Sequence, residues 1–417
     1  NNNNNYLLDA IKNINPEILV LGKEFEGSTD SEIIYSINYL RNQGKKVQFH
    51  AGEIIYESTE LLNSSEKDLI NKRREQFKAA CKRQKLNLDD LIKSMDSWNE
   101  TRLIVLGDTI VDQYSACEAI GMSAEAPVVV VKELQNRNFL GGAAVVASHV
   151  RSLGAKCDFL SVVGQDSTAD IVREELSKRN IEEHLFVDKS RPTTFKKRYV
   201  VGNQKLFRVS RLEDHNLDKE IESQIIQRLD QIAPFANGII LSDFVYGVVT
   251  EKILEKIYSV SKEYGILLFG DLQCSSQIGS ITKFKNFSLL CPNEREARLA
   301  LLDKDSGLEL LSNKLIEETN CNRLIMKLGS NGFIAYDRSL NGNISSQSFP
   351  ALSVNPVDVT GAGDSLLAIM ATGLSSDQSI MATAALGCCM ASLAVEMMGN
   401  TPINSTSLKV SIKQHLS

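Results

Sequence analysis

The segment with the most distinctive chemistry is Val357–Leu367, which reads VDVTGAGDSLL and lies near the end of a chain of 417 residues. Its small residues Gly361, Ala362 and Gly363 let the backbone approach a ligand closely and adopt angles that a Cβ atom disfavours. A long apolar stretch, which predicts a helix, follows at once. Because the free N–H groups at a helix start attract negative charge, the sequence predicts an anion-binding turn here.

Asp364 follows this turn at the predicted start of the helix and has two interpretations. As an N-cap, its carboxylate would only accept a hydrogen bond from the backbone. A carboxylate that faces a bound phosphate is repelled by it, however, so its presence favours a chemical role. Removing a proton from an attacking hydroxyl is such a role, and we predict that Asp364 is a general base. A dinucleotide-binding fingerprint is disfavoured, because Leu366 occupies the third glycine position.

The overall composition disfavours several classes of protein. The net charge of −6 argues against a general nucleic-acid binder, because affinity for a phosphate backbone needs a basic surface. The eight cysteines form no C-x-x-C pair, so zinc and dithiol chemistry are disfavoured and reduced thiols in a cytoplasmic protein are expected. The apolar stretch Ala382–Met398 is expected to be a buried helix and not a membrane span.

From about Thr101 onward, short apolar runs alternate with amphipathic stretches. The runs that end in Gly, Asp or Asn are predicted strands: Leu103–Gly107, Phe159–Gly164, Gly238–Asp243, Leu267–Asp271, Ser288–Asn293 and Arg323–Gly329. The stretches between them are predicted helices: Thr168–Arg179, Asp218–Gln231, Thr250–Tyr264, Asn293–Leu302 and Leu311–Thr319. This alternation predicts an α/β fold with a doubly wound, mainly parallel sheet flanked by helices. Ligands of such sheets bind beyond the carboxyl ends of the strands.

Two regions depart from the alternation. Pro127–Glu133 and Thr193–Ser210 are rich in β-forming residues and have no helix between their runs. Within the second region, Gly202-Asn203 predicts a hairpin turn. We interpret both as parts of a small β lid that projects from the main sheet.

The first hundred residues differ from the rest. Glu17–Gly22 and Lys46–Phe49 are predicted strands, whereas Glu66–Ser97 is highly charged with helical spacing. This charged stretch is expected to be a solvated helical linker, with a partner-binding helix as the alternative. The predicted domains are therefore 1–63, a helical linker over 64–100, and 101–417.

Several motifs resemble the ribokinase-like (PfkB) carbohydrate kinases. VDVTGAGDSLLA resembles the C-terminal signature of that family, and Gly141-Gly142 with the small residues after it resembles the N-terminal one. GDTIVD resembles the first strand with its substrate aspartate, here Asp112. Asn293-Glu294-Arg295-Glu296 resembles the N-x-x-E motif, and Lys327–Gly332 resembles a loop near the nucleotide base. These matches follow the family's order across 101–417, and they imply the ribokinase-like fold.

The resemblance also implies an activity, namely ATP-dependent phosphorylation of a sugar or sugar-phosphate hydroxyl. Asp364 would be the base, and the amides of Gly361, Ala362 and Gly363 would hold the charge that grows on the transferred group. Asn293 and Glu296 would hold Mg²⁺ through water molecules.

The remaining roles that the resemblance implies concern the two substrates. Asp112 and the two glycines before the small-residue helix, Gly141 and Gly142, would bind the sugar. Lys327, Gly329, Gly332 and Thr360 would bind the nucleotide. Asp358 would either help to bind a monovalent cation such as K⁺ or only form a turn.

The most similar subgroup comprises the heptose-phosphate kinases and related bifunctional sugar-activating proteins. Shared segments include SAEAPV (Ser123–Val128), TTFKKRYVVGNQKLFRVSRLE (Thr193–Glu213) and SDFVYGVVT (Ser242–Thr250). In the predicted lid, Arg198 and Arg208 would hold a substrate phosphate, or would only face solvent.

This chain departs from those kinases at three places. Val145 stands where an Asn is usual, Tyr246 where a Lys is usual, and Leu272-Gln273 where Pro-Lys is common. Each change removes a hydrogen-bonding group, and a site built for a sugar hydroxyl discriminates strongly when one partner is missing. Because the base and the glycines remain, we favour a changed substrate over a loss of activity.

The N-terminal region resembles the second half of a cytidylyltransferase-like domain in Pro16–Glu26 and Tyr56–Asn63. The H-x-G-H motif of that family is absent, so no nucleotidyl transfer is expected. Two alternatives to a sugar kinase stay open: a nucleoside kinase of the same fold and a non-catalytic protein that binds ATP or a nucleotide sugar. Expected partners are a small sugar or sugar phosphate and a second copy of the chain bound through the lid, with no nucleic acid and no membrane.

Overall fold

The computed structural model describes residues 6–22, 25, 30–50, 65–202, 204–273, 279–339 and 341–416. The chain forms two compact units, one made of 1–65 with 346–348 and the other of 66–345 with 349–417. Each unit is described by itself.

The first unit contains two helices and two parallel strands. They are α1 (Tyr6–Ile14), β1 (Ile18–Gly22), α2 (Ser31–Asn42) and β2 (Lys46–His50), with β1 paired to β2. The side chain of Asp30 caps α2, accepting hydrogen bonds from the backbone N–H groups of Glu32 at 2.8 Å and Ile33 at 3.3 Å. Both predicted strands are therefore present, whereas the similar segment Tyr56–Asn63 lies outside the described residues.

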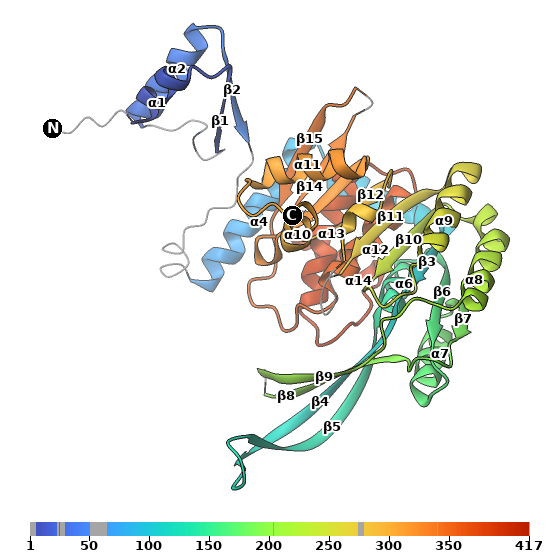
Figure 1. Ribbon diagram of the computed structural model, residues 1–417. Helices are drawn as coiled ribbons and strands as arrows, with labels where there is room; N and C mark the ends of the chain where they lie inside the picture. Colours follow the sequence, from blue (N-terminus) through green and yellow to red (C-terminus); the bar gives the residue numbers. More distant parts are fainter. Residues whose placement is uncertain are drawn as a thin grey trace. The chain divides into compact units, whose positions relative to one another are not determined.

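The second unit is built on a nine-stranded sheet in the order β15-β14-β13-β12-β11-β10-β3-β6-β7 (Figure 1). The seven strands from β13 to β7 run parallel, and β14 runs antiparallel to β13. The strands are β3 (Arg102–Gly107), β6 (Lys156–Val163), β7 (Glu182–Val187), β10 (Gly238–Asp243), β11 (Leu267–Leu272), β12 (Leu289–Leu290), β13 (Arg323–Lys327), β14 (Phe333–Arg338) and β15 (Ile344–Phe349). All six predicted strands of this sheet are present.

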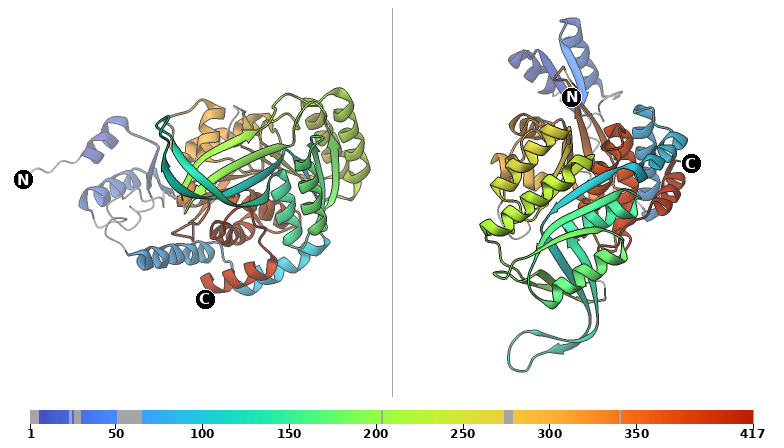
Figure 2. Two further views of the ribbon diagram at one scale, coloured as in Figure 1. Left: turned by 90° about the horizontal axis from the view of Figure 1, so that it is seen from below. Right: turned by 90° about the vertical axis from the view of Figure 1, so that its right-hand side faces the viewer.

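Helices cover both faces of the sheet (Figure 2). Alternate residues of β3 show why: Leu103 and Val105 join one apolar core, while Ile104 and Leu106 join the other. The first core includes α6 (Ala143–Ser152), α7 (Ser167–Lys178), α12 (Ala362–Leu374), α13 (Ile380–Val395) and α14 (Ser405–Leu416). The second includes α8 (Lys219–Ile232), η3 (Ala233–Phe235), α9 (Glu251–Tyr264), η4 (Ile281–Lys283), α10 (Glu294–Leu301) and α11 (Leu308–Thr319). The fold is thus the expected doubly wound α/β architecture.

A separate four-stranded sheet forms the lid, in the order β5-β4-β8-β9. Its strands are β4 (Thr109–Met122), β5 (Val129–Gly142), β8 (Thr194–Val201) and β9 (Gln204–Arg211). The lid is larger than the sequence predicted, because β4 continues almost directly from the end of β3 and pairs with β5 along its whole length. The predicted hairpin joins β8 to β9, although Asn203 itself lies outside the described residues.

The charged stretch Glu66–Ser97 was expected to be a solvated linker, but it packs against the second unit. It forms α4 (Glu66–Arg83), α5 (Leu88–Ser94) and η2 (Met95–Glu100), which belong to the second unit. The side chains of Phe77 and Trp98 are 0% exposed and join the first apolar core. The charges occupy the outer faces of these helices, and the few apolar residues between them are what the core buries.

The apolar stretch near the C-terminus forms α13, in which most residues are buried. This agrees with the predicted buried helix. Within the described ranges, no helix combines the length and apolar character that crossing a bilayer requires.

Candidate active site

The order of strands reverses direction at β3, which has β6 on one side and β10 on the other. In doubly wound sheets, ligands bind at such a switch point, beyond the carboxyl ends of the strands. A cavity of about 650 Å³ opens there. It is lined by most of the predicted site residues: Asp112, Gly142, Arg198, Arg208, Asn293, Glu296, Lys327, Gly329, Gly332, Thr360, Gly361, Ala362, Gly363 and Asp364. Gly141 and Asp358 are not among the lining residues.

The glycine turn before α12 has the geometry that its sequence predicts. Gly361 adopts a left-handed backbone with φ of 81°, and a Cβ atom there would lie 2.4 Å from Oδ1 of Asn400. A larger residue would therefore be strained and would also clash. Ala362 is the first residue of α12, so the free N–H groups of the helix open onto the cavity.

Asp364 lies in the first turn of α12 and is only 6% exposed. Its Oδ1 accepts a hydrogen bond of 2.8 Å from the side-chain amide of Gln273, which follows β11. Burial, reinforced by the negative charge of Asp271, raises the pKa of Asp364 to about 7. The carboxyl group therefore exchanges its proton close to neutral pH, as a general base should.

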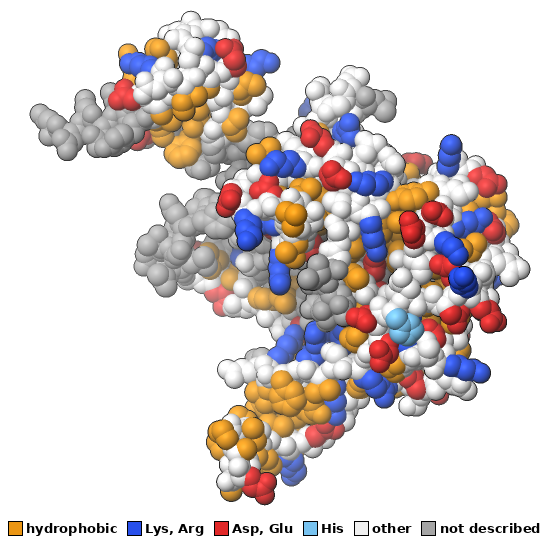
Figure 3. All heavy atoms as spheres, in the orientation of Figure 1, with side chains coloured by type: hydrophobic (Ala, Val, Ile, Leu, Met, Phe, Trp, Pro, Cys, Tyr) orange, Lys and Arg blue, Asp and Glu red, His pale blue; other side chains and the backbone are white. Residues whose placement is uncertain are grey.

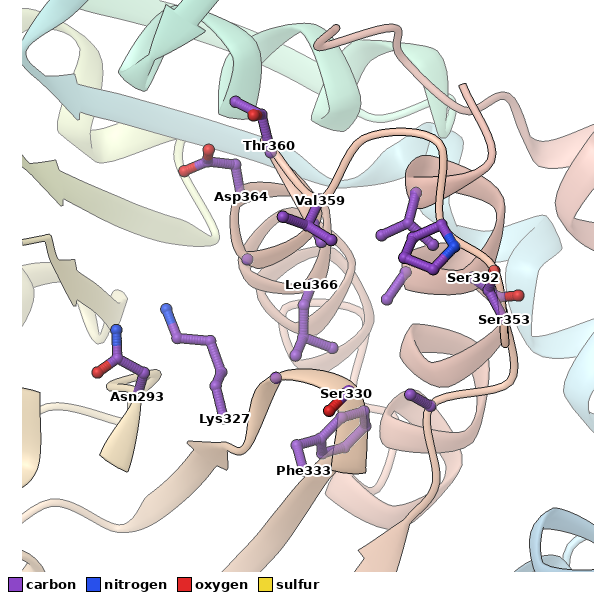
Figure 4. A pocket seen from close by; sticks show the side chains of 18 of the residues that line it. Asn293, Lys327, Ser330, Phe333, Ser353, Val359, Thr360, Asp364, Leu366 and Ser392 are labelled. Atoms are coloured by element: carbon purple, nitrogen blue, oxygen red, sulfur yellow. The ribbon is translucent and has the colours of Figure 1, made fainter. Parts of the chain in front are cut away.

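Lys327, at the end of β13, lies beside the glycine turn that is predicted to bind an anion. Its Nζ donates a hydrogen bond of 2.7 Å to Asp271 and lies 3.3 Å from the position that a Cβ atom on Gly363 would occupy. Figure 4 shows its amino group pointing into the cavity toward Asp364. Burial alone would lower the pKa of Lys327, but the charges of Asp271 and Glu296 outweigh burial and raise it. The sequence placed this residue near the nucleotide base, whereas the structure places its charge beside the glycine turn.

Asp112 lines the same cavity from lid strand β4 and is buried. Its Oδ2 accepts a hydrogen bond of 3.1 Å from Asn400, and Arg198 pairs with its Oδ1. A Cβ atom on Gly141 would lie only 2.4 Å from Oδ2 of Asp112, which explains why a glycine stands there. The glycine pair thus makes room for the predicted sugar-binding carboxylate, and Asp112 is well placed to accept hydrogen bonds from hydroxyl groups.

Three cationic side chains line the lid side of the cavity. Arg198 on β8 lies opposite Arg208 on β9 in the register of the two strands. Lys196, two residues before Arg198 on the same face of β8, is 3% exposed and lies over the rings of Phe244 and Tyr246, at 5.1 and 5.3 Å from their centroids. Lys196 was not among the residues predicted from the sequence, although its two-residue spacing from Arg198 places both side chains on one face of a strand.

Asn400 is a second residue that the sequence analysis missed. Besides donating to Asp112, its amide donates a hydrogen bond of 3.0 Å to the backbone carbonyl of Leu140, while its Oδ1 is buried without a hydrogen-bond partner in the described part of the chain. Asn400 therefore lies between Asp112 and Gly361. No local motif marks Asn400, because its role depends on contacts with residues far away in the sequence.

Asp358 was expected either to help bind a monovalent cation or only to form a turn. The structure gives it protein partners, and its Oδ1 accepts a hydrogen bond of 3.0 Å from the backbone N–H of Thr360, as in a turn. Its Oδ1 accepts a hydrogen bond of 2.7 Å from the ammonium group of Lys205 on β9, and its Oδ2 accepts one of 2.6 Å from the hydroxyl of Tyr114 on β4. Burial alone would raise the pKa of Asp358, but these two donors lower it to about 2. The charge that K⁺ would balance is thus already balanced by a lysine of the lid.

Asn293 and Glu296 face each other at the start of α10. The Asn293 side chain accepts a hydrogen bond from the Glu296 backbone, and the Glu296 carboxylate accepts one from the Asn293 backbone, each at 2.8 Å. This capping box gives the motif a structural role. In the described ranges, no three His, Cys, Asp or Glu side chains gather to hold a metal ion. The oxygen donors present fit Mg²⁺ that keeps water molecules and shares phosphate oxygens, not an all-protein cage.

Comparisons with known proteins show the family to which the chain belongs. The sequence model described as pfkB family carbohydrate kinase matches residues 100–406. The chain is 30% identical over 316 residues to the bifunctional protein HldE of Campylobacter jejuni subsp. doylei, covering 75% of this chain and 65% of that protein. It is 32% identical over 284 residues to the protein of the same name from Helicobacter hepaticus, covering 66% of this chain and 56% of that protein.

Solved structures show the same fold. Phosphofructokinase-2 from Escherichia coli, in complex with substrates and products, matches with a TM-score of 0.63 and 16% identity, over 75% of this chain and 98% of that one. Arabidopsis thaliana ribokinase, complexed with ribose and ATP, matches with a TM-score of 0.57 and 19% identity, over 75% and 99% of the two chains. Identities this low establish only the common ribokinase-like fold.

Proposed function

Because this chain belongs to the pfkB family of carbohydrate kinases, we propose that it transfers the γ-phosphoryl group of ATP to a hydroxyl of a sugar phosphate similar to a heptose phosphate. One observation carries the proposal. Asp364, whose pKa is raised by burial to about 7, lies in one cavity with the glycine turn, the ammonium group of Lys327 and the carboxylate of Asp112. A base, an anion site and a hydroxyl-binding group are the parts that phosphoryl transfer to an alcohol needs.

In the proposed reaction, Asp364 removes the proton of the acceptor hydroxyl as that oxygen attacks the γ-phosphorus. A new oxygen–phosphorus bond forms while the bond between the γ-phosphorus and the β–γ bridging oxygen breaks, and ADP leaves. The N–H groups at the start of α12 and the Lys327 ammonium hold the charge on the transferred group. Bound Mg²⁺, near Asn293 and Glu296, would supply further neutralisation of the phosphates.

The lid supports a phosphorylated acceptor over a neutral sugar. Arg198, Arg208 and Lys196 line the same cavity as Asp112, and guanidinium groups bind phosphate with two parallel hydrogen bonds. The resemblance of the lid to that of heptose-phosphate kinases also favours a phosphorylated acceptor. Tyr246, where those kinases usually have a lysine, is buried beneath Lys196. We therefore propose that the natural acceptor differs from their usual sugar.

The test is ADP release with ATP and a panel of heptose, hexose and pentose phosphates, run beside the unphosphorylated sugars and nucleosides. We expect turnover with at least one sugar phosphate. Turnover with the unphosphorylated sugars and the nucleosides should be weak or absent. The variant Asp364→Asn should lose about 10²- to 10⁴-fold in kcat while still binding ADP, because only the proton acceptor is removed. Wild-type turnover in that variant would remove Asp364 from the mechanism.

The alternatives give different results in the same assay. A nucleoside kinase would release ADP with nucleosides and not with sugar phosphates, whereas a non-catalytic protein would bind ADP and turn over none of the panel. Nucleotidyl transfer is proposed to be absent, and labelled CTP or ATP with sugar 1-phosphates would test this directly. A cytoplasmic location stays a prediction from the scattered cysteines.

A further inference from the structure

One side chain of the cavity comes from a segment that precedes the family match. Arg73 lies on α4, whereas the family model begins at residue 100. Arg73 lines the same cavity as Asp364, together with Ser330, Phe333 and Ser353. The loop that resembles the nucleotide loop, Lys327–Gly332, contains Ser330, so Arg73 lies at the end of the cavity where the nucleotide is expected.

The guanidinium group of Arg73 bridges two separate segments that border the cavity. Its Nη1 donates a hydrogen bond to the backbone carbonyl of Ser353, and its Nη2 donates one of 3.3 Å to the backbone carbonyl of Ser330. Ser330 belongs to η5 (Gly329–Asn331), and Ser353 follows β15. Figure 4 shows these two serines on different segments that border the cavity. Arg73 therefore fixes the distance between two of its walls.

Helix α4 is itself held firmly against the second unit. Phe77, one turn after Arg73, is 0% exposed in the first apolar core, and Arg74 donates a hydrogen bond of 3.4 Å from its Nε to the carbonyl of His415 on α14. A cation on a docked helix can hold the two carbonyls without a large loss of side-chain freedom. The bridge is therefore a fixed part of the cavity.

Among the described residues, no carboxylate balances the charge of Arg73. The guanidinium is half-buried, burial lowers its pKa, and it pairs with no carboxylate in the part of the chain that the structure describes. A half-buried cation costs free energy unless an anion accompanies it. A nucleoside polyphosphate bound in this cavity would bring that negative charge.

We propose that Arg73 is a positioning residue for the nucleotide: by bridging Ser330 and Ser353, helix α4 shapes the nucleotide end of the cavity. The inference rests on the proposed kinase function and adds an element to it that lies outside the family match. It also requires a guanidinium, because the single ammonium group of lysine does not reproduce the planar fork that spans two carbonyls.

The experiment measures ADP binding with Mg²⁺ by isothermal titration calorimetry for the wild type and the variants Arg73→Ala, Arg73→Lys and Arg74→Ala. Arg74→Ala is the matched control, because Arg74 sits on the same helix and contacts α14 instead of the cavity. We expect Arg73→Ala to weaken ADP binding about tenfold or more, Arg73→Lys to recover only part of the loss, and Arg74→Ala to bind like the wild type. With an acceptor from the panel, KM for ATP should rise while kcat and the acceptor KM stay close to wild type.

The results for the wild type and the two alanine variants decide whether Arg73 positions the nucleotide. If the wild type binds ADP and Arg73→Ala binds it equally well, or if Arg74→Ala causes the same loss, the inference is wrong while the kinase function stands. If the wild type binds no nucleotide, both fail together. Thermal unfolding shows which variants are folded, and if Arg73→Ala is not, Arg73→Lys carries the comparison.

Discussion

At the scale of single residues, the protonation state of Asp364 should control turnover. Burial raises the pKa of Asp364 to about 7 from an ordinary value of 3.8. Since the base must be unprotonated, we expect kcat/KM to fall about tenfold per pH unit below this pKa and to level off above it. The hydrogen bond from Gln273 lowers this pKa, so Gln273→Leu should move the acidic limb of the profile to higher pH. Profiles of both proteins from pH 5.5 to about pH 9 test this.

The same raised pKa has a consequence for stability. Between about pH 4 and about pH 7, the folded protein keeps a proton on Asp364 that the unfolded chain has lost, so its contribution to stability falls as pH rises through this window. Asp364→Asn removes this dependence, and it should therefore unfold at a higher temperature than the wild type at pH 8. A flat kcat/KM profile below pH 7, or a wild type more stable than the variant at pH 8, would contradict the assigned pKa.

Site residues could be predicted from the sequence where they are neighbours in the chain, but not where they meet only in the fold. The glycine turn and Asp364 could be predicted because the chemistry lies in adjacent residues. The hydrogen bond between Gln273 and Asp364 joins residues 91 positions apart, and it exists only because β11 ends beside the start of α12. Lys327 was found, but its position beside Gly363 depends on the packing of β13 against the turn.

Among the elements, the ion pair between Lys205 and Asp358 ties lid strand β9 to the loop that precedes α12. Lys205→Met removes the ammonium group. We expect a severalfold rise in KM for the acceptor and a smaller change in kcat, because the lid carries the cationic residues that we propose to bind the acceptor. Kinetics with varied acceptor measure this. The control is Lys197→Met, since Lys197 on β8 pairs with Glu133 at 2.6 Å and not with Asp358.

The lysine also decides the role of K⁺. While Lys205 balances Asp358, replacing KCl by tetramethylammonium chloride should leave wild-type activity unchanged. In Lys205→Met the carboxylate loses its cation, and activity should then respond to K⁺. A wild type that needs K⁺ would show that the Lys205 contact does not persist in the working enzyme.

The strands of the main sheet could be predicted because their apolar runs are continuous and end in turn-forming residues. The helices could be predicted because the stretches between those runs are amphipathic. Predicted and observed Gly238–Asp243 coincide as β10. The lid was underestimated because β4 (Thr109–Met122) mixes polar and apolar residues and lacks the continuous apolar run by which the strands of the main sheet were predicted. The helices over 66–100 were taken for a linker because a few buried residues, such as Phe77 and Trp98, are outnumbered by charges.

At the scale of the whole molecule, the lid is the surface we propose for association with a second copy. Hydrophobic side chains gather on it (Figure 3) and include Ile120, Met122, Val129, Leu134, Phe207 and Val209, all more than half exposed. Exposed apolar patches of this kind mark interaction sites. Val209→Asp should turn a dimer into a monomer in light scattering coupled to size-exclusion chromatography, whereas Val410→Asp, an exposed position on α14, should not. A monomeric wild type would contradict the proposal.

We expect the catalytic unit to begin before residue 100. The family match starts at residue 100, but the apolar core also includes Phe77, Leu91, Met95 and Trp98 from the preceding helices. Removing a buried Phe or Trp side chain typically costs about 3–5 kcal/mol, and a domain has only about 5–15 kcal/mol in total. Deleting residues 1–65, most of the first compact unit, should therefore leave cooperative thermal unfolding and ADP binding intact. Deleting 1–99 should give an aggregated protein, or one without a cooperative transition. A stable, ADP-binding 100–417 fragment would show that these helices decorate the core and do not complete it.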